Sequence, residues 1–184
     1  MRLSPLTGLA VLLLAAPLSA ESSQAPGAVP APAPEPPKAA ANRVETTQAM
    51  RLLALPMKGS YTQHPAAFER ISAFLTSRSV APLGPPVARY FSDPSTPETD
   101  LAWEVGFPVA SGVKAEAPFE IRDVAAGLNA IHVHKGPYEE LATAWPTFVQ
   151  WMMTNGYRPV GPPMNVFVGD PSSPVVELRM PIEK

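Results

Sequence analysis

Two glutamates, Glu104 and Glu177, are the residues of this chain best suited to act on a small molecule. Each lies in an alternating stretch, on the side of an expected strand opposite the apolar residues. A carboxylate shielded from water disfavours its charge unless a cation or hydrogen-bond donors compensate it. If both faced one groove, a lipophilic cation would be a natural ligand. The alternative is that both face solvent, with Glu177 beside Arg179 or a base on a neighbouring strand.

Aromatic residues occur at positions where they could line the same groove. Tyr61 and Tyr138 each follow a turn glycine at the entrance to an expected helix, and further aromatic side chains lie on expected strands at Tyr90, Trp103 and Phe167. Aromatic walls would add cation–π attraction to a bound cation. The alternative for the tyrosines is packing of the strand-to-helix corner. Trp145 lies in a helical stripe of apolar residues, which favours a place in the core.

Other chemistry has little support in the sequence. His132 and His134 alternate on one expected strand and His64 precedes a helix, but zinc normally needs a third and a fourth ligand, and nothing marks a haem ligand. The chain has no cysteine, no serine in a Gly-x-Ser-x-Gly elbow and no glycine-rich phosphate loop. We therefore expect no metal, no cofactor and no catalytic residue.

The chain also contains an internal repeat. Three matches share one constant offset in residue number: Lys58–Tyr61 with Lys135–Tyr138, Pro82–Pro86 with Pro159–Pro163 and Asp93-Pro94 with Asp170-Pro171. A fourth, Glu104–Pro108 with Glu177–Pro181, follows at a slightly smaller offset, because the second connecting turn is shorter. Two copies are too few for a solenoid, which needs about three. They indicate one pseudo-two-fold domain with a groove where the halves meet, and a site that draws on both halves.

Each half follows the order strand, helix, strand, strand. In the first half, Phe68, Ile71 and Leu75 recur at helical spacing after Pro65. The expected strands are 50–57, 87–92 and 101–109 in the first half and 128–134, 164–168 and 175–182 in the second, with short extra strands at 44–47 and 121–124. A second helix runs from Pro137 to a stop at Asn155-Gly156. Antiparallel pairing with helices on one face predicts an α+β fold, a curved antiparallel sheet with two helices and a central groove.

The N-terminal region predicts export. Met1-Arg2 precedes an apolar run from Leu9 to Leu18 and small residues at a plausible cleavage point, so residues 1–20 are expected to be a signal peptide. The run is too short for a comfortable membrane span. Residues 21–42 are rich in proline and alanine, typical of a disordered linker. The domain then covers 43–184, with halves at about 43–115 and 120–184, in the periplasm or outside the cell.

Charge and cysteine content narrow the possible partners. The chain has 14 basic and 16 acidic residues; removal of Arg2 with the leader gives a net charge of about −3. This balance offers no electrostatic surface for nucleic acid and no polybasic membrane patch. We expect no nucleic-acid partner and no membrane span after the leader is removed. The lack of cysteine means that the core must stabilise the fold without disulfides.

Several of these residues together resemble the GyrI-like, or AraC-type effector-binding, domain family. They are Lys135-Gly136-Pro137-Tyr138-Glu139, Gly156-Tyr157, Gly161-Pro162-Pro163, Phe167, Asp170-Pro171 and Met180-Pro181-Ile182. The resemblance covers about residues 43–184 and implies two fused strand-helix-strand-strand units. Family members act as sensing domains of transcription regulators, as gyrase inhibitors or as stand-alone small-molecule binders. Some relatives hydrolyse cyclopropane-containing natural products.

Two departures from the family change what the resemblance implies. A signal sequence and a proline-rich stretch stand where a DNA-binding helix-turn-helix would be, which argues against a transcription-factor role. The family often carries Glu-x-Tyr on the strand after the Gly-Pro turn, where this chain has Asn165-Val166-Phe167. An amide donates and accepts hydrogen bonds but has no charge. We expect weaker selectivity for cations, with neutral aromatic molecules binding comparably.

The sequence therefore predicts a secreted or periplasmic, non-enzymatic module that binds small apolar or aromatic molecules. Two alternatives stay open: a protein-interaction or envelope module that keeps the fold without a ligand, and a hydrolase that cleaves cyclopropanes. The expected ligand-binding residues are Tyr61, Tyr90, Trp103, Glu104, Tyr138, Asn165, Phe167 and Glu177.

Overall fold

The computed structural model describes residues 42–184. The predicted leader and, apart from Asn42, the predicted linker lie outside them. The two helices are α1 (His64–Ser77) and α2 (Leu141–Thr154). The strands are β1 (Arg43–Thr47), β2 (Met50–Lys58), β3 (Val87–Tyr90), β4 (Ala102–Pro108), β5 (Glu120–Val124), β6 (Gly127–Lys135), β7 (Arg158–Pro159), β8 (Met164–Phe167) and β9 (Val175–Glu183). The antiparallel sheet and its two helices confirm the predicted α+β fold.

The bounds of the elements recur along the chain. β1, β2, α1 and β3 have counterparts of the same lengths, β5, β6, α2 and β8, and all four pairs keep the offset of the sequence repeat. Strand β9 follows β4 at the smaller offset seen for Glu104 and Glu177, and each of these acids is the third residue of its strand. Short 3-10 turns begin at Tyr61 and at the matching Tyr138. Equivalent sequence positions in the two halves therefore occupy equivalent places in the secondary structure.

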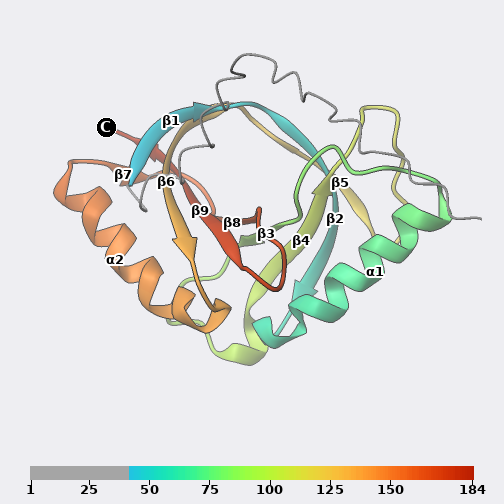
Figure 1. The fold of residues 1–184 in the computed structure, drawn as a ribbon, viewed down its shortest axis with the longest axis horizontal. Helices are drawn as coiled ribbons and strands as arrows, with labels where there is room; N and C mark the ends of the chain where they lie inside the picture. Colours follow the sequence, from blue (N-terminus) through green and yellow to red (C-terminus); the bar gives the residue numbers. More distant parts are fainter. Residues whose placement is uncertain (1–41) are drawn as a thin grey trace, which may run out of the picture. The chain divides into compact units, whose positions relative to one another are not determined.

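The first strand of each half pairs with a strand of the other half. The strand order is β1-β6-β9-β8-β3-β4-β2-β5, with β7 paired to β9 outside this order. Thus β1, the first strand of the first half, pairs with β6 of the second, and β5, the first strand of the second half, pairs with β2 of the first. Figure 1 shows the resulting curl of the sheet. The extra strands were predicted, and their exchange ties the halves together.

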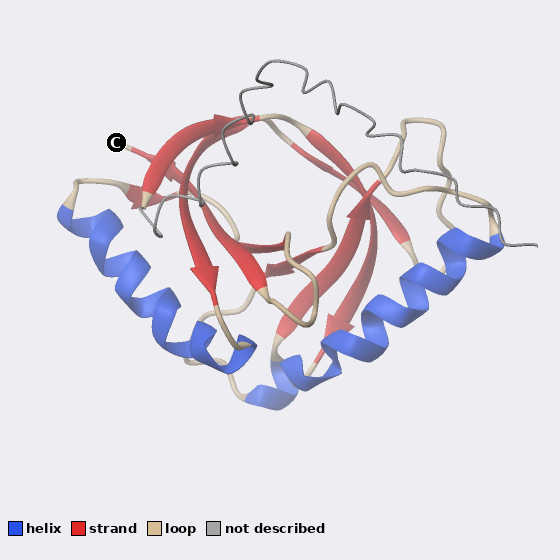
Figure 2. Ribbon diagram, in the orientation of Figure 1, coloured by secondary structure: helices blue, strands red, loops and turns tan. Residues whose placement is uncertain are grey.

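Both helices lie on the outer side of the curved sheet, one against each half (Figure 2). Apolar side chains of α1 at Ala67, Ile71 and Leu75 pack on β2 and β4. In α2, Phe148 and Met152 pack on β6 and β9. The helical spacing of these residues matches the stripes expected from the sequence. No helix among residues 42–184 is long and apolar enough to cross a membrane.

The central strands β3 and β8 join the halves and present two faces. On the face covered by the helices, called the helix face, Ala88 pairs with Asn165. On the opposite side, called the inner face, Arg89 pairs with Met164. Because side chains alternate along a strand, neighbouring residues of β3 and β8 belong to different faces. These two strands therefore position two separate groups of side chains.

Candidate functional site

A chain of hydrogen bonds crosses the helix face from one helix to the other. The indole Nε1 of Trp145 on α2 donates to Asn165 Oδ1 at 3.2 Å, and Asn165 Nδ2 donates to the Tyr90 hydroxyl oxygen at 2.9 Å. The Tyr90 hydroxyl lies 3.4 Å from His64 Nε2 at the start of α1. Asn165 is only 3% exposed, so protein groups occupy both ends of its amide. The chain links both halves through Asn165.

The direction of these hydrogen bonds follows from the chemistry of the groups. An indole can only donate, so the oxygen of Asn165 must face Trp145 and its nitrogen must face Tyr90. The Tyr90 oxygen accepts, and its own proton is free to go to His64 if that ring nitrogen is unprotonated. Burial lowers the pKa of His64 and raises the pKa of Tyr90. Both effects keep the chain uncharged near neutral pH.

Aromatic rings of the first half surround the start of this chain. Tyr61 lies edge-on to Tyr90, with ring centroids 5.1 Å apart, and edge-on to Trp103 at 5.9 Å. His64 lies 4.4 Å from Trp103. Trp103 is buried, and its Nε1 donates to the carbonyl oxygen of Gly59 at 2.8 Å. Trp103 therefore fixes the turn before the helix, while Tyr61 and Tyr90 are only half buried.

Phe167 joins the aromatic residues of the two halves. It packs against both hydrophobic cores, lies edge-on to Phe68 with centroids 5.4 Å apart, and lies 5.9 Å from Tyr138. Tyr138 is 42% exposed, the most open ring of the group. We call Tyr61, His64, Phe68, Tyr90, Trp103, Tyr138, Trp145, Asn165 and Phe167 the helix-face cluster. Six of them were predicted from the sequence as site residues, whereas His64 and Phe68 were not. Trp145 packs against the core of the second half, as predicted, and its Nε1 also reaches Asn165.

The eight predicted site residues do not form one site. Six of them belong to the helix-face cluster, whereas Glu104 and Glu177 lie on the inner face. The alternation of β4 explains the separation, because Glu104 must point away from the face that buries Trp103. The sequence placed the acids opposite the apolar residues correctly, but the aromatic candidates lie on the apolar side.

The two glutamates bind arginines from exchanged strands. Glu104, only 2% exposed, accepts hydrogen bonds from Arg89 Nη1 at 2.7 Å and from Arg122 Nε on β5 at 3.2 Å. Glu177 accepts from Arg179 Nε at 2.9 Å and from Arg43 Nη2 on β1 at 3.0 Å. Each acid therefore holds a strand that belongs to the other half in sequence.

The protonation of Glu177 reflects these partners. Burial raises its pKa, but hydrogen bonds and charge from Arg179 and Arg43 outweigh burial, and the net pKa lies below the ordinary value. The expected neighbour Arg179 is thus present, although the acid is not turned to solvent. Because arginines already neutralise both acids, neither is left to attract a cationic ligand.

The two histidines of β6 each contact a polar group of the protein. His132 Nδ1 lies 2.7 Å from Asn42 Oδ1, and His134 Nε2 lies 3.2 Å from the carbonyl oxygen of Pro137. Within residues 42–184, no group of three or more His, Cys, Asp or Glu side chains could hold a metal ion. The geometry gives these histidines structural contacts.

The fold is a two-unit α+β domain, with one helix and a set of antiparallel strands in each unit. The GyrI-like small molecule binding domain matches residues 42–183, and the chain belongs to this family. No protein with a curated description matches the chain in sequence.

Solved structures share the fold at low sequence identity. The EcmrR–DNA complex matches with a TM-score of 0.71 and 17% sequence identity, and the match covers 79% of this chain but only 58% of the EcmrR chain. The EcmrR C-terminal domain alone matches with a TM-score of 0.68 and 16% identity, over 80% of this chain and 99% of that domain. A hydrolase from Listeria innocua matches with a TM-score of 0.56 and 14% identity, over 77% of this chain and 91% of the hydrolase chain. SAV2435 bound to tetraphenylphosphonium matches with a TM-score of 0.55 and 11% identity, over 78% of this chain and 94% of the SAV2435 chain. Because EcmrR is seen in a complex with DNA, the comparisons do not support the expected absence of a nucleic-acid partner.

Proposed function

We propose that this protein is a non-enzymatic binding module for neutral, largely apolar or aromatic small molecules, taken up at the helix-face cluster. The observation that carries the proposal is the buried amide of Asn165 at the centre of the cluster, hydrogen-bonded to Trp145 and Tyr90. Membership in a small-molecule binding family supports the general activity. The neutral amide defines the ligand class.

The charge of the cluster favours neutral ligands. Among the described residues, the helix-face cluster contains no carboxylate, and the two acids expected there are on the inner face with arginines. A cation entering the cluster would lose hydration without gaining an anionic partner. A neutral aromatic molecule would keep the gain from burial of apolar surface and from ring contacts.

The ligand enters beside Tyr138 and Phe167. Tyr138 is the most exposed ring of the cluster, and Phe167 connects it to the rings of the first half. Outward rotation of Tyr138 would open the path to Phe167 and to the amide chain behind it. Both halves then contribute to the bound state, as expected for a site at a pseudo-two-fold junction.

The setting of this activity is the periplasm or the outside of the cell. The support is the sequence of the first twenty residues, with a basic start, an apolar run and small residues after it. The length of that run would not favour a membrane span. N-terminal sequencing of the protein isolated from the cell envelope tests this part, and a chain beginning at Met1 would contradict it.

Hydrolysis is the second candidate, because structures with the same fold include hydrolases from Listeria innocua. At 14% identity this likeness concerns the fold. The amide of Asn165 cannot supply the general acid or base that a carboxylate would. A protein-interaction role without a ligand would instead leave the cluster unresponsive to every small aromatic molecule.

Titration with two molecules of similar shape tests the proposal. Tetraphenylphosphonium is a cation, and triphenylphosphine oxide carries three of the same rings without a net charge. We expect wild type to bind the neutral molecule at least as well as the cation, and Asn165→Glu to shift the preference toward the cation roughly tenfold or more. Asn165→Gln, which keeps the amide, is the control and should keep the wild-type ratio. A strong wild-type preference for the cation, unchanged in Asn165→Glu, would exclude Asn165 from the site.

A further inference from the structure

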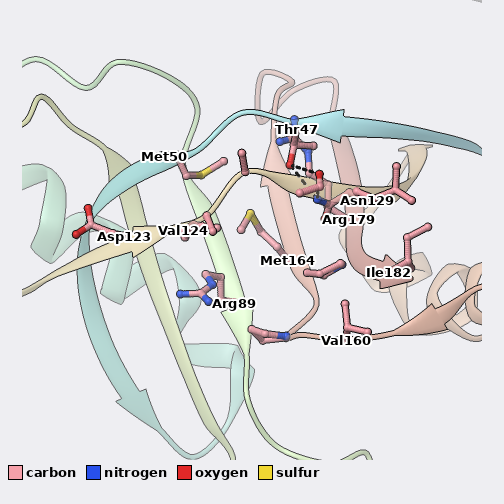
Figure 3. Close-up of a pocket in the computed structure, with 16 residues that line it drawn as sticks. Thr47, Met50, Arg89, Asp123, Val124, Asn129, Val160, Met164, Arg179 and Ile182 are labelled. Carbon is pink, nitrogen blue, oxygen red and sulfur yellow. Dashed lines mark hydrogen bonds between the residues drawn. The ribbon is translucent and has the colours of Figure 1, made fainter. Parts of the chain in front are cut away.

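A cavity of about 380 Å³ lies on the inner face, on the opposite side of the sheet from the helix-face cluster. Its size falls in the lower part of the range of small-molecule sites, about 300–1,000 Å³. Residues from both halves line it, including Met50 of β2 and Ile182 of β9 (Figure 3). None of the eight residues predicted from the sequence is among them. We call this space the inner cavity.

The short links that follow the two exchanged strands, β1 and β5, border the inner cavity. Thr47 and Met50 flank the link from β1 to β2, and Val124 and Gly127 flank the equivalent link from β5 to β6. Thr47 Oγ1 accepts a hydrogen bond from Asn129 Nδ2 at 2.8 Å, which joins the end of β1 to β6 beside the cavity. The cavity therefore lies where the two halves meet, and the strand exchange defines its border.

Two arginines and an apolar lining give the inner cavity an amphiphilic character. Arg89 pairs with Met164 in the sheet, and Met164 pairs with Arg179, so the arginines stand on either side of Met164 (Figure 3). With adjacent strands about 4.8 Å apart, the two arginine backbones are separated by roughly 10 Å. Apolar side chains complete the lining: Met50, Val124, Leu128, Val160, Met164 and Ile182.

Both guanidinium groups retain donors that no side chain uses. Arg89 donates to Glu104 through Nη1, while its Nε is buried and has no hydrogen-bond partner among the described residues. Arg179 donates to Glu177 through Nε and Nη2, and its Nη1 has no side-chain acceptor among residues 42–184. A guanidinium has five N–H donors. The protein encloses the Arg89 Nε, so the acceptor oxygens of a ligand would reach the outer donors, Arg179 Nη1 and Arg89 Nη2.

The carboxylates near the cavity are already bound. Glu104 and Glu177 each accept from two arginines, and Asp123, which lines the cavity, accepts from Arg51 Nη1 at 3.0 Å. The inner cavity thus offers spare donors and no spare carboxylate among the described residues. This combination favours an anion over a cation. Because nearby acids balance the arginines, the attraction acts at hydrogen-bond range and not at long distance.

We propose that the inner cavity is a second binding site, for small amphiphilic anions that carry a carboxylate or sulfonate on an aromatic or aliphatic body. Arg179 and Arg89 bind the acidic group, and the apolar side chains contact the body. Arg–carboxylate contacts are among the stronger hydrogen bonds in proteins. This site goes beyond the proposed function, since it uses other residues, the other face of the sheet and the opposite ligand charge.

A matched pair of fluorescent probes tests the proposal on the mature full chain. 8-Anilinonaphthalene-1-sulfonate is an anion, and N-phenyl-1-naphthylamine has the same rings without the sulfonate. We expect the anion to bind one site in wild type, and Arg179→Gln to weaken it roughly tenfold, with a much smaller effect on the neutral probe. Saturating triphenylphosphine oxide should not displace the anion. Displacement by it would place the anion at the helix face and overturn the proposal.

Equivalent positions in the two halves supply a control that leaves the arginines intact. Val160 is 54% exposed and lines the inner cavity; Leu83, its counterpart in the first half and 70% exposed, does not line it. Val160→Glu places a negative charge at the rim and should weaken binding of the sulfonate at least about fivefold. Leu83→Glu adds the same charge and should change it less than about twofold. Equal affinities of the two variants for the sulfonate, with both still folded by circular dichroism, would overturn the proposal.

Discussion

The two faces of the short central strands β3 and β8 carry side chains of opposite character, uncharged on one face and charged on the other. On the helix face, Tyr90 and Asn165 belong to an uncharged chain of hydrogen bonds among aromatic rings. On the inner face, Arg89 binds the buried Glu104 beside Met164. Residues next to each other in sequence therefore belong to a neutral group and a charged group. The sheet separates the two groups.

This separation has a physical reason. A buried carboxylate is stable when bases compensate it, and Glu104 and Glu177 have two arginines each. The same carboxylates on the helix face would meet the rings of the cluster and no described arginine. The inner face can therefore hold charge and fasten the exchanged strands, while the helix face can accept neutral molecules.

The largest effect is expected at Glu104. Glu104→Ala leaves the guanidinium of Arg89 buried without its partner and should lower the free energy of unfolding by roughly 3–5 kcal/mol. Glu177→Ala should lower it by only about 1–2 kcal/mol, because Glu177 is more exposed and its partner Arg43 can reach water. Urea unfolding followed by circular dichroism measures both. Equal losses would show that burial does not distinguish the two acids.

The next effect concerns the hydrogen-bond chain of the helix face. Tyr90→Phe removes the acceptor of Asn165 Nδ2 and should cost about 1–3 kcal/mol of stability. Tyr61→Phe is the matched control, since the neighbouring Tyr61 ring makes no hydrogen bond through its hydroxyl to a described side chain, and should cost less than about 0.5 kcal/mol. Urea unfolding compares the two. A similar loss in both variants would mean that the chain does not stabilise the fold.

Acid should weaken the helix face before the inner face. Burial lowers the pKa of His64, so the unfolded chain takes up a proton first as the pH falls below about 6.5. The free energy of unfolding should therefore decrease from that pH downward, until the pH passes the folded pKa. His132, whose pKa is also lowered by burial and by His134, adds to this slope. Glu177, with its lowered pKa, loses its contribution only at more acidic pH.

The variant His64→Gln isolates the first of these groups. Glutamine can still accept from Tyr90 but does not titrate, so stability between about pH 5 and pH 7 should vary less than in wild type. Unfolding midpoints measured across this range provide the test. An unchanged slope would assign the acid sensitivity to His132 or to other groups.

The smallest effect on stability, with a clear effect on binding, is expected at Tyr138. Tyr138 is 42% exposed and lies outside both cores, so Tyr138→Ala should change the free energy of unfolding by less than about 0.5 kcal/mol. It should weaken binding of triphenylphosphine oxide about three- to tenfold through loss of a ring contact. Binding of the sulfonate probe should not change. Weakening of the sulfonate alone would reverse the roles of the two faces.

The sequence predicted most of the fold, because local patterns determine local structure. The spacing of Phe68, Ile71 and Leu75 predicted α1, and the repeat predicted the corresponding elements of the second half. The exchange of β1 and β5 could not be predicted, because a short strand shows its own pattern but not its partner. Pairing is decided by the arrangement of the whole sheet.

The site was harder to predict than the fold. Alternation along β4 correctly placed Glu104 opposite Trp103. The residues around Glu104 in the sequence do not show that Arg122 reaches it from the second half. Likewise, Trp145 has the spacing of a core residue, and only the folded structure brings its Nε1 to Asn165. Contacts between residues distant in sequence decide which candidates form one site.

A two-dimensional ¹H–¹⁵N spectrum recorded during titration with triphenylphosphine oxide shows most directly which face binds the neutral ligand. The indole N–H of Trp145 reports on Asn165 and the helix face, and the Nε–H of Arg179, bound to Glu177, reports on the inner face. If the neutral ligand binds the helix face, the Trp145 indole signal shifts saturably and the Arg179 signal does not shift. A shift of Arg179 with Trp145 unmoved would place the neutral ligand on the inner face and overturn the assignment of the helix-face cluster as its site.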